Sequence, residues 1–147
     1  MGVIQRQTNV NASDSAVFAY LLDVSRHSEW AGHQLEVTPK SAGPTEVGSA
    51  FETVGHQFGA QPGTVTITEA VPNQQIVYES DGPVGHFRHG FIIKDNGDGT
   101  VLVTKTMEMI EVKSLPLKLL RPIVGAVIAP RGLDGDLARI KQKLEAA

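Results

Sequence analysis

The sequence predicts an α+β fold in which a curved antiparallel sheet of about seven strands faces a long C-terminal helix. Residues 34–110 break into short β-rich runs separated by turn residues, at the spacing expected of an antiparallel meander. Residues 133–144 repeat apolar side chains at helical spacing. The length of 147 residues is typical of one domain and leaves too little chain for two cores. We therefore expect a single domain over residues 1–147.

The N-terminal part predicts one strand followed by two short helices. Residues 3–11 have the Thr- and Val-containing composition of a strand. Ser13 is a good N-cap for a helix over 13–22, and Asp14 places a negative charge in its first turn. A second brief helical turn follows Asp23 and ends near Trp30, the only Trp, before Ala31-Gly32.

The middle of the chain predicts six more strands, which with the first make about seven. Their expected ranges are 35–41, 49–56, 63–70, 75–80, 85–94 and 100–110. Gly, Pro and Asn punctuate these runs. The clearest signal is the run from Asp95 to Gly99, which predicts a hairpin because Asn and Gly tolerate positive φ.

The C-terminal part predicts an amphipathic helix preceded by a broken one. Leu133, Leu137, Ile140 and Leu144 recur at helical steps, and we place Asp136 and the nearby cations mostly on the other faces. The preceding run, 115–130, is apolar but interrupted by Pro and Gly. It falls short of the roughly 20 apolar residues that a bilayer-spanning helix needs. We expect it to form a broken helix that lies across the sheet.

Charge is distributed unevenly along the chain. From Lys113 to the end, seven basic residues stand against three acidic ones, a net +4, which leaves −7 for the remainder because the whole chain carries −3. A solvated helix face is the simpler interpretation, and a peripheral membrane contact is kept as an alternative. No basic-aromatic interleaving indicates nucleic acid. The absence of Cys excludes a disulfide framework and fits a reducing compartment, and the N-terminus lacks a signal-peptide pattern, so we expect a cytoplasmic protein.

Several function classes lack their sequence signatures. The chain contains no nucleophile elbow, no phosphate-binding Gly-Lys-Ser/Thr loop and no dinucleotide fingerprint. His86 and His89 would lie on opposite faces of a strand, which separates them as metal ligands. Asp95 to Gly99 lacks the downstream Glu of a calcium loop. We expect no cofactor and no metal.

Collinear motifs cover nearly the whole chain. They run from Asn11 to Phe18, Asp23 to Trp30, Gly48 to Phe51, Thr66 to Tyr78, Asp98 to Thr100, Met107 to Met109 and Leu137 to Glu145. In this order they resemble the polyketide cyclase/dehydrase and lipid-transport family of the START-like, or SRPBCC, superfamily. The resemblance implies a helix-grip fold with a deep cavity between the sheet and the long helix. Members include carriers, cyclases, hydrolases and regulatory binding proteins, so it implies no single activity.

Strand phase, taken with this resemblance, predicts which residues line the cavity. If Phe91 and Ile93 point inward, period-two alternation turns His89 inward as well, and turns His86 and Arg88 outward. The expected cavity residues are Trp30, Phe51, Tyr78, Phe87, His89, Phe91, Lys105 and Met107. Trp30 suits plain packing as well as ligand contact.

Three of these residues are candidates for catalysis. His89 would act as general acid or base, Tyr78 as hydrogen-bond donor, and Lys105 as the cation that polarises a carbonyl. Lys105 is anomalous on an apolar face, because a buried unpaired charge is costly. One explanation is that its side chain reaches an edge, becomes neutral, or meets an acidic partner or ligand. The simpler explanation is a local bulge that turns it outward. Glu52 and His56, four apart on one strand, are a further acid-base pair to test.

Three functions follow as hypotheses. The first is binding or transport of a small hydrophobic ligand of lipid, polyketide or aromatic type. The second is a cyclase or dehydratase that uses polar cavity residues. The third is a protein-interaction domain of the chaperone-activator kind, which predicts an exposed apolar patch. We expect a monomer or homodimer.

Overall fold

A seven-stranded antiparallel sheet forms the centre of the computed structural model, which describes residues 3–31, 35–40, 43–56 and 61–146. The strands are β1 (Ile4–Val10), β2 (Leu35–Pro39), β3 (Ala50–Gly55), β4 (Gln61–Val71), β5 (Gln75–Asp81), β6 (Gly85–Asp95) and β7 (Val101–Val112). Their order in the sheet is β1-β7-β6-β5-β4-β3-β2, and each neighbouring pair is antiparallel. The predicted fold class is therefore confirmed.

The β6–β7 hairpin forms where the turn residues predicted it. Gly97 and Gly99 adopt positive φ values of 82° and 88°, a region that glycine enters without steric cost. The Asp95 carboxylate accepts a hydrogen bond from the Gly97 amide at 2.8 Å, which closes the turn locally. The two strands then pair along almost their whole length, from Asp95 opposite Val101 to Gly85 opposite Val112.

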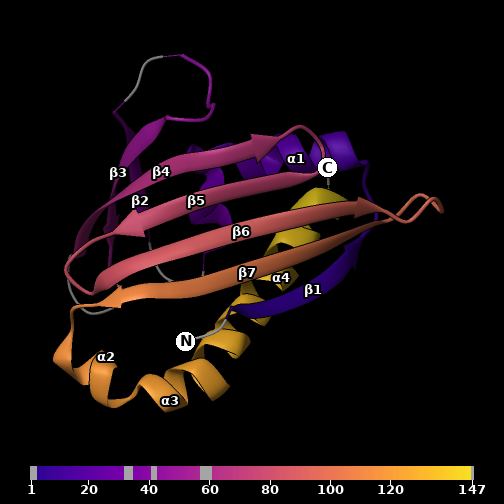
Figure 1. Cartoon of the computed structure of the whole chain (residues 1–147). Helices are drawn as coiled ribbons and strands as arrows, with labels where there is room; N and C mark the ends of the chain where they lie inside the picture. Colours follow the sequence, from indigo (N-terminus) through magenta and orange to yellow (C-terminus); the bar gives the residue numbers. More distant parts are fainter. Residues whose placement is uncertain (1–2, 32–34, 41–42, 57–60, 147) are drawn as a thin grey trace.

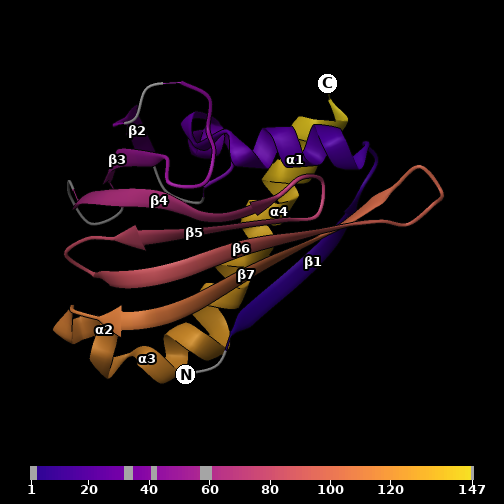
Figure 2. The same ribbon diagram turned by 45° about the horizontal axis from the view of Figure 1, so that its top comes forward.

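Three helical elements cover one face of the sheet. They are α1 (Asp14–Leu22), the 3₁₀ helix η1 (Val24–Glu29) and α4 (Ala129–Glu145). The Ser13 hydroxyl caps α1 by accepting a hydrogen bond from the Ala16 amide at 3.1 Å, as predicted. In Figures 1 and 2, α4 runs obliquely across the sheet, and α1 lies near the C-terminal end of α4. We call the covered side of the sheet the inner face.

The long helix is held to the sheet by apolar and polar contacts. Its buried side chains include Leu133, Leu137 and Ile140, the positions that the helical spacing predicted. At its C-terminal end the Glu145 carboxylate accepts from the Asn11 amide at 2.8 Å. The helix therefore packs along the sheet over its whole length.

The segment before α4 is broken, as its prolines predicted. It consists of α2 (Leu115–Leu119), α3 (Arg121–Ile123) and the π-helix η2 (Val124–Ile128). Figures 1 and 2 place α2 and α3 beyond the end of β7, so the expectation that this segment lies across the sheet is wrong. Because Ser114 caps α2 directly after β7 ends, the chain turns at the sheet's end.

Two apolar clusters form the interior. The larger one lies between the inner face and the helices, and its fully buried members include Leu21, Ile67, Ile76, Phe91, Leu137 and Ile140. The smaller cluster joins Met109 and Val112 of β7 to Val124 of η2. Within the described part of the chain, no helix is long and apolar enough to cross a membrane.

Candidate functional site

Neighbouring strands bring aromatic and polar side chains together on the inner face. The register places Tyr78 of β5 opposite His89 of β6, and Phe91 of β6 opposite Lys105 of β7. Residues directly opposite each other in an antiparallel pair project from the same face of the sheet. The four side chains therefore project from one face of the sheet, as strand phase predicted.

A polar aromatic stack forms the first part of this site. The rings of Tyr78 and His89 lie 4.8 Å apart between centroids and within 15° of parallel. The Nε2 atom of His89 lies 3.1 Å from the Ser80 hydroxyl, at hydrogen-bond distance. Burial raises the pKa of Tyr78 above its usual value, and the negative charge of Asp136 adds to the rise. Tyr78 is therefore a neutral hydrogen-bond donor near pH 7.

Lys105 is the most unusual member of the site, because it is a cation that is only 2% exposed. Its Nζ atom lies 4.0 Å from the Asp136 carboxylate and 5.4 and 5.3 Å from the ring centroids of Trp30 and Phe91. Burial lowers its pKa to about 8, and the Asp136 charge partly offsets that effect. The expectation that a bulge turns Lys105 outward is wrong, because β6 and β7 pair in regular register here.

Asp136 supplies the carboxylate that lets a lysine remain inside. Its side chain is 15% exposed and also accepts from the Arg139 guanidinium at 2.9 Å. Placing it on the polar side of the helix was therefore wrong. It lies three residues after Leu133 and four before Ile140, so it falls within the buried stripe of α4.

The short helix η1 adds two aromatic rings from the opposite side. His27 is buried, and its ring lies 4.7 Å from that of Trp30 and 5.3 Å from that of Tyr78. Its Nε2 lies 2.9 Å from the Leu21 carbonyl and so donates to it, and burial lowers its pKa to about 4. Sequence reasoning missed His27. The sequence signal that could have found it is its spacing of three residues from Trp30, because side chains three residues apart point the same way in a 3₁₀ helix.

We refer to these residues as the inner cluster. Its members are His27, Trp30, Tyr78, His89, Phe91, Lys105 and Asp136. Trp30 is held from α4, because Arg139 Nε donates to the Trp30 carbonyl at 2.7 Å. The Trp30 indole N–H is buried and has no hydrogen-bond partner among the residues that the structure describes.

Three expected cavity residues lie outside this cluster. Phe87 borders it, with its ring centroid 6.5 Å from that of His89. Phe87 and Met107 pack against the smaller apolar cluster at the end of β7. Phe51 is buried in the main core on β3. The inner cluster thus gathers five of the eight expected cavity residues.

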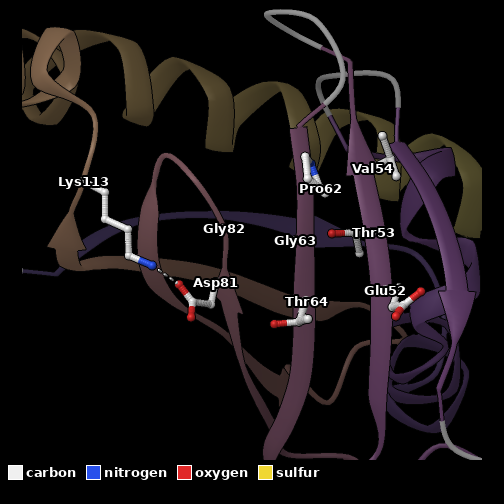
Figure 3. A pocket seen from close by; sticks show the side chains of 9 residues that line it. All are labelled: Glu52, Thr53, Val54, Pro62, Gly63, Thr64, Asp81, Gly82 and Lys113. Atoms are coloured by element: carbon white, nitrogen blue, oxygen red, sulfur yellow. Dashed lines mark hydrogen bonds and ion pairs between the residues drawn. The ribbon is translucent and has the colours of Figure 1, made fainter.

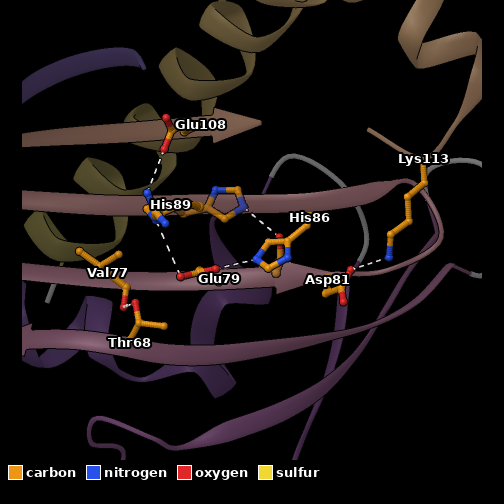
Figure 4. Close-up of polar contacts among 10 residues, drawn as sticks. Thr68, Val77, Glu79, Asp81, His86, His89, Glu108 and Lys113 are labelled. Carbon is orange, nitrogen blue, oxygen red and sulfur yellow. Dashed lines mark hydrogen bonds and ion pairs between the residues drawn. The ribbon is translucent and has the colours of Figure 1, made fainter. Parts of the chain in front are cut away.

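The outer face of the sheet carries polar pairs. His86 Nε2 lies 2.6 Å from the Glu79 carboxylate (Figure 4), and the Arg88 guanidinium binds the Glu108 carboxylate at 3.1 Å. Alternation thus turned both residues outward, as predicted. The proposed Glu52–His56 pair is wrong: His56 Nε2 lies 2.7 Å from Glu36 of the neighbouring strand, because cross-strand neighbours approach more closely than residues four apart on one strand.

Two surface grooves among the described residues are lined by residues outside the inner cluster. One, of about 480 Å³, lies at the ends of β3, β4 and β5, where Lys113 binds Asp81 at 2.8 Å (Figure 3). The other, of about 340 Å³, lies beside the β6–β7 hairpin. Neither includes a residue of the inner cluster, which is packed between the sheet, η1 and α4. No grouping of three or more His, Asp or Glu residues suited to a metal occurs among the described residues.

Comparison with known families identifies the chain. The model of the family described as polyketide cyclase / dehydrase and lipid transport matches residues 1–145. The chain belongs to this family. The resemblance inferred from the motifs is therefore confirmed.

Solved structures of the same shape come from several bacteria. A protein from Thermus thermophilus matches with a TM-score of 0.77 at 11% identity, covering 99% of this chain and 98% of its own. The Zhui aromatase/cyclase from Streptomyces sp. R1128 matches with a TM-score of 0.75 at 15% identity, covering 98% and 93%. A Chromobacterium violaceum protein matches with a TM-score of 0.71 at 14% identity, and the match covers 99% of each chain. At such identities the likeness shows the fold alone. No curated protein sequence matches this chain.

Proposed function

We propose that this family member binds a small, largely apolar or aromatic molecule that carries oxygen acceptors, between the inner face of the sheet and α4. One observation supports the proposal above others. Trp30 Nε1 is buried without a hydrogen-bond partner among the described residues, and it shares one buried cluster with the Tyr78 hydroxyl and with Lys105, whose Nζ lies 4.0 Å from the Asp136 carboxylate.

The cost of this arrangement argues for a guest. A buried donor without a partner costs about 1–3 kcal/mol, and a core with only a structural role would place apolar side chains at such positions. Ligand sites, in contrast, are mostly apolar and hold a few polar groups that orient the guest. All three groups are donors, since Tyr78 is neutral and Lys105 is largely protonated at pH 7. The guest should therefore present acceptors, such as the carbonyl or phenolic oxygens of a polyketide-like compound.

The aromatic side chains define the rest of the guest. The rings of Trp30, Tyr78 and Phe91 surround the donors, with the Trp30 and Phe91 rings edge to face at a centroid distance of 5.6 Å. Flat aromatic guests gain both area burial and ring-ring contact in such a setting. Because the cluster is enclosed, the guest enters when η1 or α4 shifts outward, which makes the binding-competent form a minor state of the free protein.

A second candidate function is proton transfer on the bound guest. The observation that favours it is the Tyr78–His89 stack, in which His89 Nε2 is oriented by the Ser80 hydroxyl at 3.1 Å. His89 would serve as acid or base, while Lys105 polarises a carbonyl, as a cyclase or dehydratase requires. The aromatase/cyclase among the solved structures makes this chemistry a natural comparison. A His89→Ala variant that converts an identified substrate as fast as the parent would remove this role.

The binding function can be tested through the single tryptophan. Trp30 lies in the cluster, so quenching of its fluorescence by 1,8-dihydroxyanthraquinone reports occupancy directly. Tyr78→Phe removes only the donor and should raise Kd about five- to ten-fold. Tyr20→Phe is the matched control, because the Tyr20 hydroxyl bonds Glu29 instead, and its Kd should change less than about two-fold. Native mass spectrometry of the purified protein should also detect co-purified aromatic or lipid mass.

Two outcomes would overturn the binding proposal. The first is the absence of quenching across a panel of hydroxylated anthraquinones and naphthols, together with the absence of any co-purified small molecule. The second is an equal loss of affinity in the Tyr78→Phe and Tyr20→Phe variants, which would place the probe outside the inner cluster.

A further inference from the structure

The broken helical segment before α4 exposes an unusual number of large apolar side chains. Eleven such side chains are exposed among the residues that the structure describes, and six of them fall between positions 115 and 128. They are Leu115, Leu119, Leu120, Ile123, Val127 and Ile128. We call these six residues the apolar edge. Scattered exposed apolar residues are ordinary on a protein surface, but their concentration in one short segment indicates an interaction site.

The apolar edge lies on a supported part of the molecule. Its segment lies beyond the end of β7 in both ribbon views (Figures 1 and 2). On the other side of the same segment, Leu117 and Val124 pack against Met109 and Val112 of β7. The edge is thus presented outward by residues that are themselves anchored in the smaller cluster.

The charged residues within this segment of the sequence are all basic. The sequence between Glu111 and Asp134 has no acidic residue and includes Lys118, Arg121 and Arg131. Lys118 and Arg131 are exposed. This contrasts with the whole chain, which carries a net charge of −3. Cations interleaved with large apolar side chains are complementary to an anionic lipid surface, where the apolar groups enter the acyl boundary and the cations meet headgroups.

The prolines of this segment limit how deeply it could enter a bilayer. Pro116, Pro122 and Pro130 divide the segment into short helical pieces. Short broken helices suit the headgroup region and do not span. A second copy of the chain is a poorer occupant, because a two-fold contact would bring together two segments that both carry only positive charge.

We propose that the apolar edge docks the protein onto bilayers that contain anionic phospholipid. The docking rests on residues outside the inner cluster, so it stands or falls separately from small-molecule binding. Docking would hold the apolar edge against the bilayer, where hydrophobic small molecules dissolve.

Vesicle co-sedimentation of the full chain tests the docking. The probes are vesicles of phosphatidylcholine alone and of a roughly 2:1 mixture with phosphatidylglycerol. The protein should sediment with the mixed vesicles and at least about ten-fold less with the neutral ones, and added salt should reduce binding. Leu115→Ser/Leu119→Ser should weaken partitioning by more than about ten-fold, since two apolar side chains no longer enter the bilayer.

Charge variants separate docking from general attraction. Lys118→Gln/Arg131→Gln should weaken partitioning roughly thirty-fold, because each cation near an anionic surface contributes a factor of about five. Lys40→Gln/Lys94→Gln removes two exposed lysines outside the apolar edge and should change partitioning onto the mixed vesicles by less than about two-fold. Ile92→Ser, on the outer face of β6 and 48% exposed, is the control for the apolar change.

Each of three results would overturn the proposal. The first is an absence of sedimentation with the mixed vesicles, and the second is an equal loss in the edge variants and their controls. The third is self-association of the parent in analytical ultracentrifugation that Leu115→Ser/Leu119→Ser abolishes, which would assign the edge to a second copy. Circular dichroism of every variant checks that the fold is retained.

Discussion

The ammonium of Lys105 on β7 lies 4.0 Å from the carboxylate of Asp136 on α4, so one buried ion pair joins the sheet to the helix that covers it. The pair is longer than a hydrogen bond, and the lysine is almost fully enclosed. Desolvation of two charges often exceeds their mutual attraction, so a pair of this kind is weak evidence for stability. It points instead to a role in the site, and its energetics can be measured.

Replacing Lys105 by Met should leave stability at pH 7 unchanged or raise it by up to about 3 kcal/mol, because the fold no longer encloses an ammonium. The folded pKa is about 8, below the unfolded value of 10.5. Between these values the unfolded state holds more protons, so the free energy of unfolding of the parent should rise with pH by about 3 kcal/mol. The variant should lack this rise.

Urea unfolding at a series of pH values from 7 to 11 measures this difference. Lys94→Met, at an exposed position of β6, is the control and should follow the parent. Parallel profiles for the parent and Lys105→Met would contradict the enclosed position of the amine.

Asp136→Asn should destabilise the fold by about 1–2 kcal/mol at pH 7, because loss of the carboxylate lowers the pKa of Lys105 further and the enclosed amine must give up its proton. Adding Lys105→Met to this variant should restore most of the loss, since no unpaired charge would remain. Asp134→Asn changes an exposed neighbour that meets Arg6 at 3.6 Å and should cost less than about 0.5 kcal/mol. Equal effects at positions 134 and 136, or additive effects in the double variant, would refute the coupling.

His27 should make the fold sensitive to mild acid. Its folded pKa of about 4 lies below the 6.5 of an ordinary histidine, so the fold holds the neutral ring and the unfolded chain takes up the proton first. The stabilisation is complete above pH 6.5 and declines by about 3 kcal/mol as pH falls to 4. His27→Phe keeps a ring in place and loses the hydrogen bond to the Leu21 carbonyl at 2.9 Å, so it should cost about 1–2 kcal/mol at pH 7.

The measurement is the difference between the unfolding profiles of the parent and His27→Phe from pH 7 to 4. This difference should shrink or reverse as the pH falls, because only the parent carries the His27 proton linkage. His56→Gln, an exposed change beside Glu36, is the control. A difference that stays constant over the whole range would show that the buried ring does not resist protonation.

The predictable parts of this molecule are those that depend on local pattern. Ser13 caps α1, and the glycines at 97 and 99 close the hairpin, because each acts within a few residues. Alternation along β6 assigned His86 outward and His89 inward correctly because strand geometry has a fixed period. The helix cap, the hairpin glycines and the strand alternation lie within the part of the chain that the family model matches.

The parts that the sequence did not predict depend on contacts between distant elements. Strand phase placed Lys105 on the inner face, but its partner Asp136 comes from a helix 31 positions later, where the sequence pattern places the charged residues mostly on faces other than the apolar one. No local pattern states which residue of α4 meets which residue of β7. The packing of the inner cluster likewise depends on how η1 brings His27 and Trp30 against the sheet.

Gly90 provides a final prediction, because the sheet leaves no room for a side chain there. A Cβ atom at this position would lie 2.6 Å from the Thr106 hydroxyl oxygen on the neighbouring strand, with the Ile76 carbonyl oxygen at 3.6 Å. Gly90→Ala should therefore cost about 1–3 kcal/mol through overpacking, although alanine normally stabilises a strand relative to glycine. In a Thr106→Ala background the same change should cost less than about 0.5 kcal/mol, since the obstructing oxygen is gone and the Thr106 Cβ lies 4.0 Å away. Chemical denaturation of the four proteins in this cycle measures the coupling, and equal costs in both backgrounds would mean that strands β6 and β7 are spaced differently at this point.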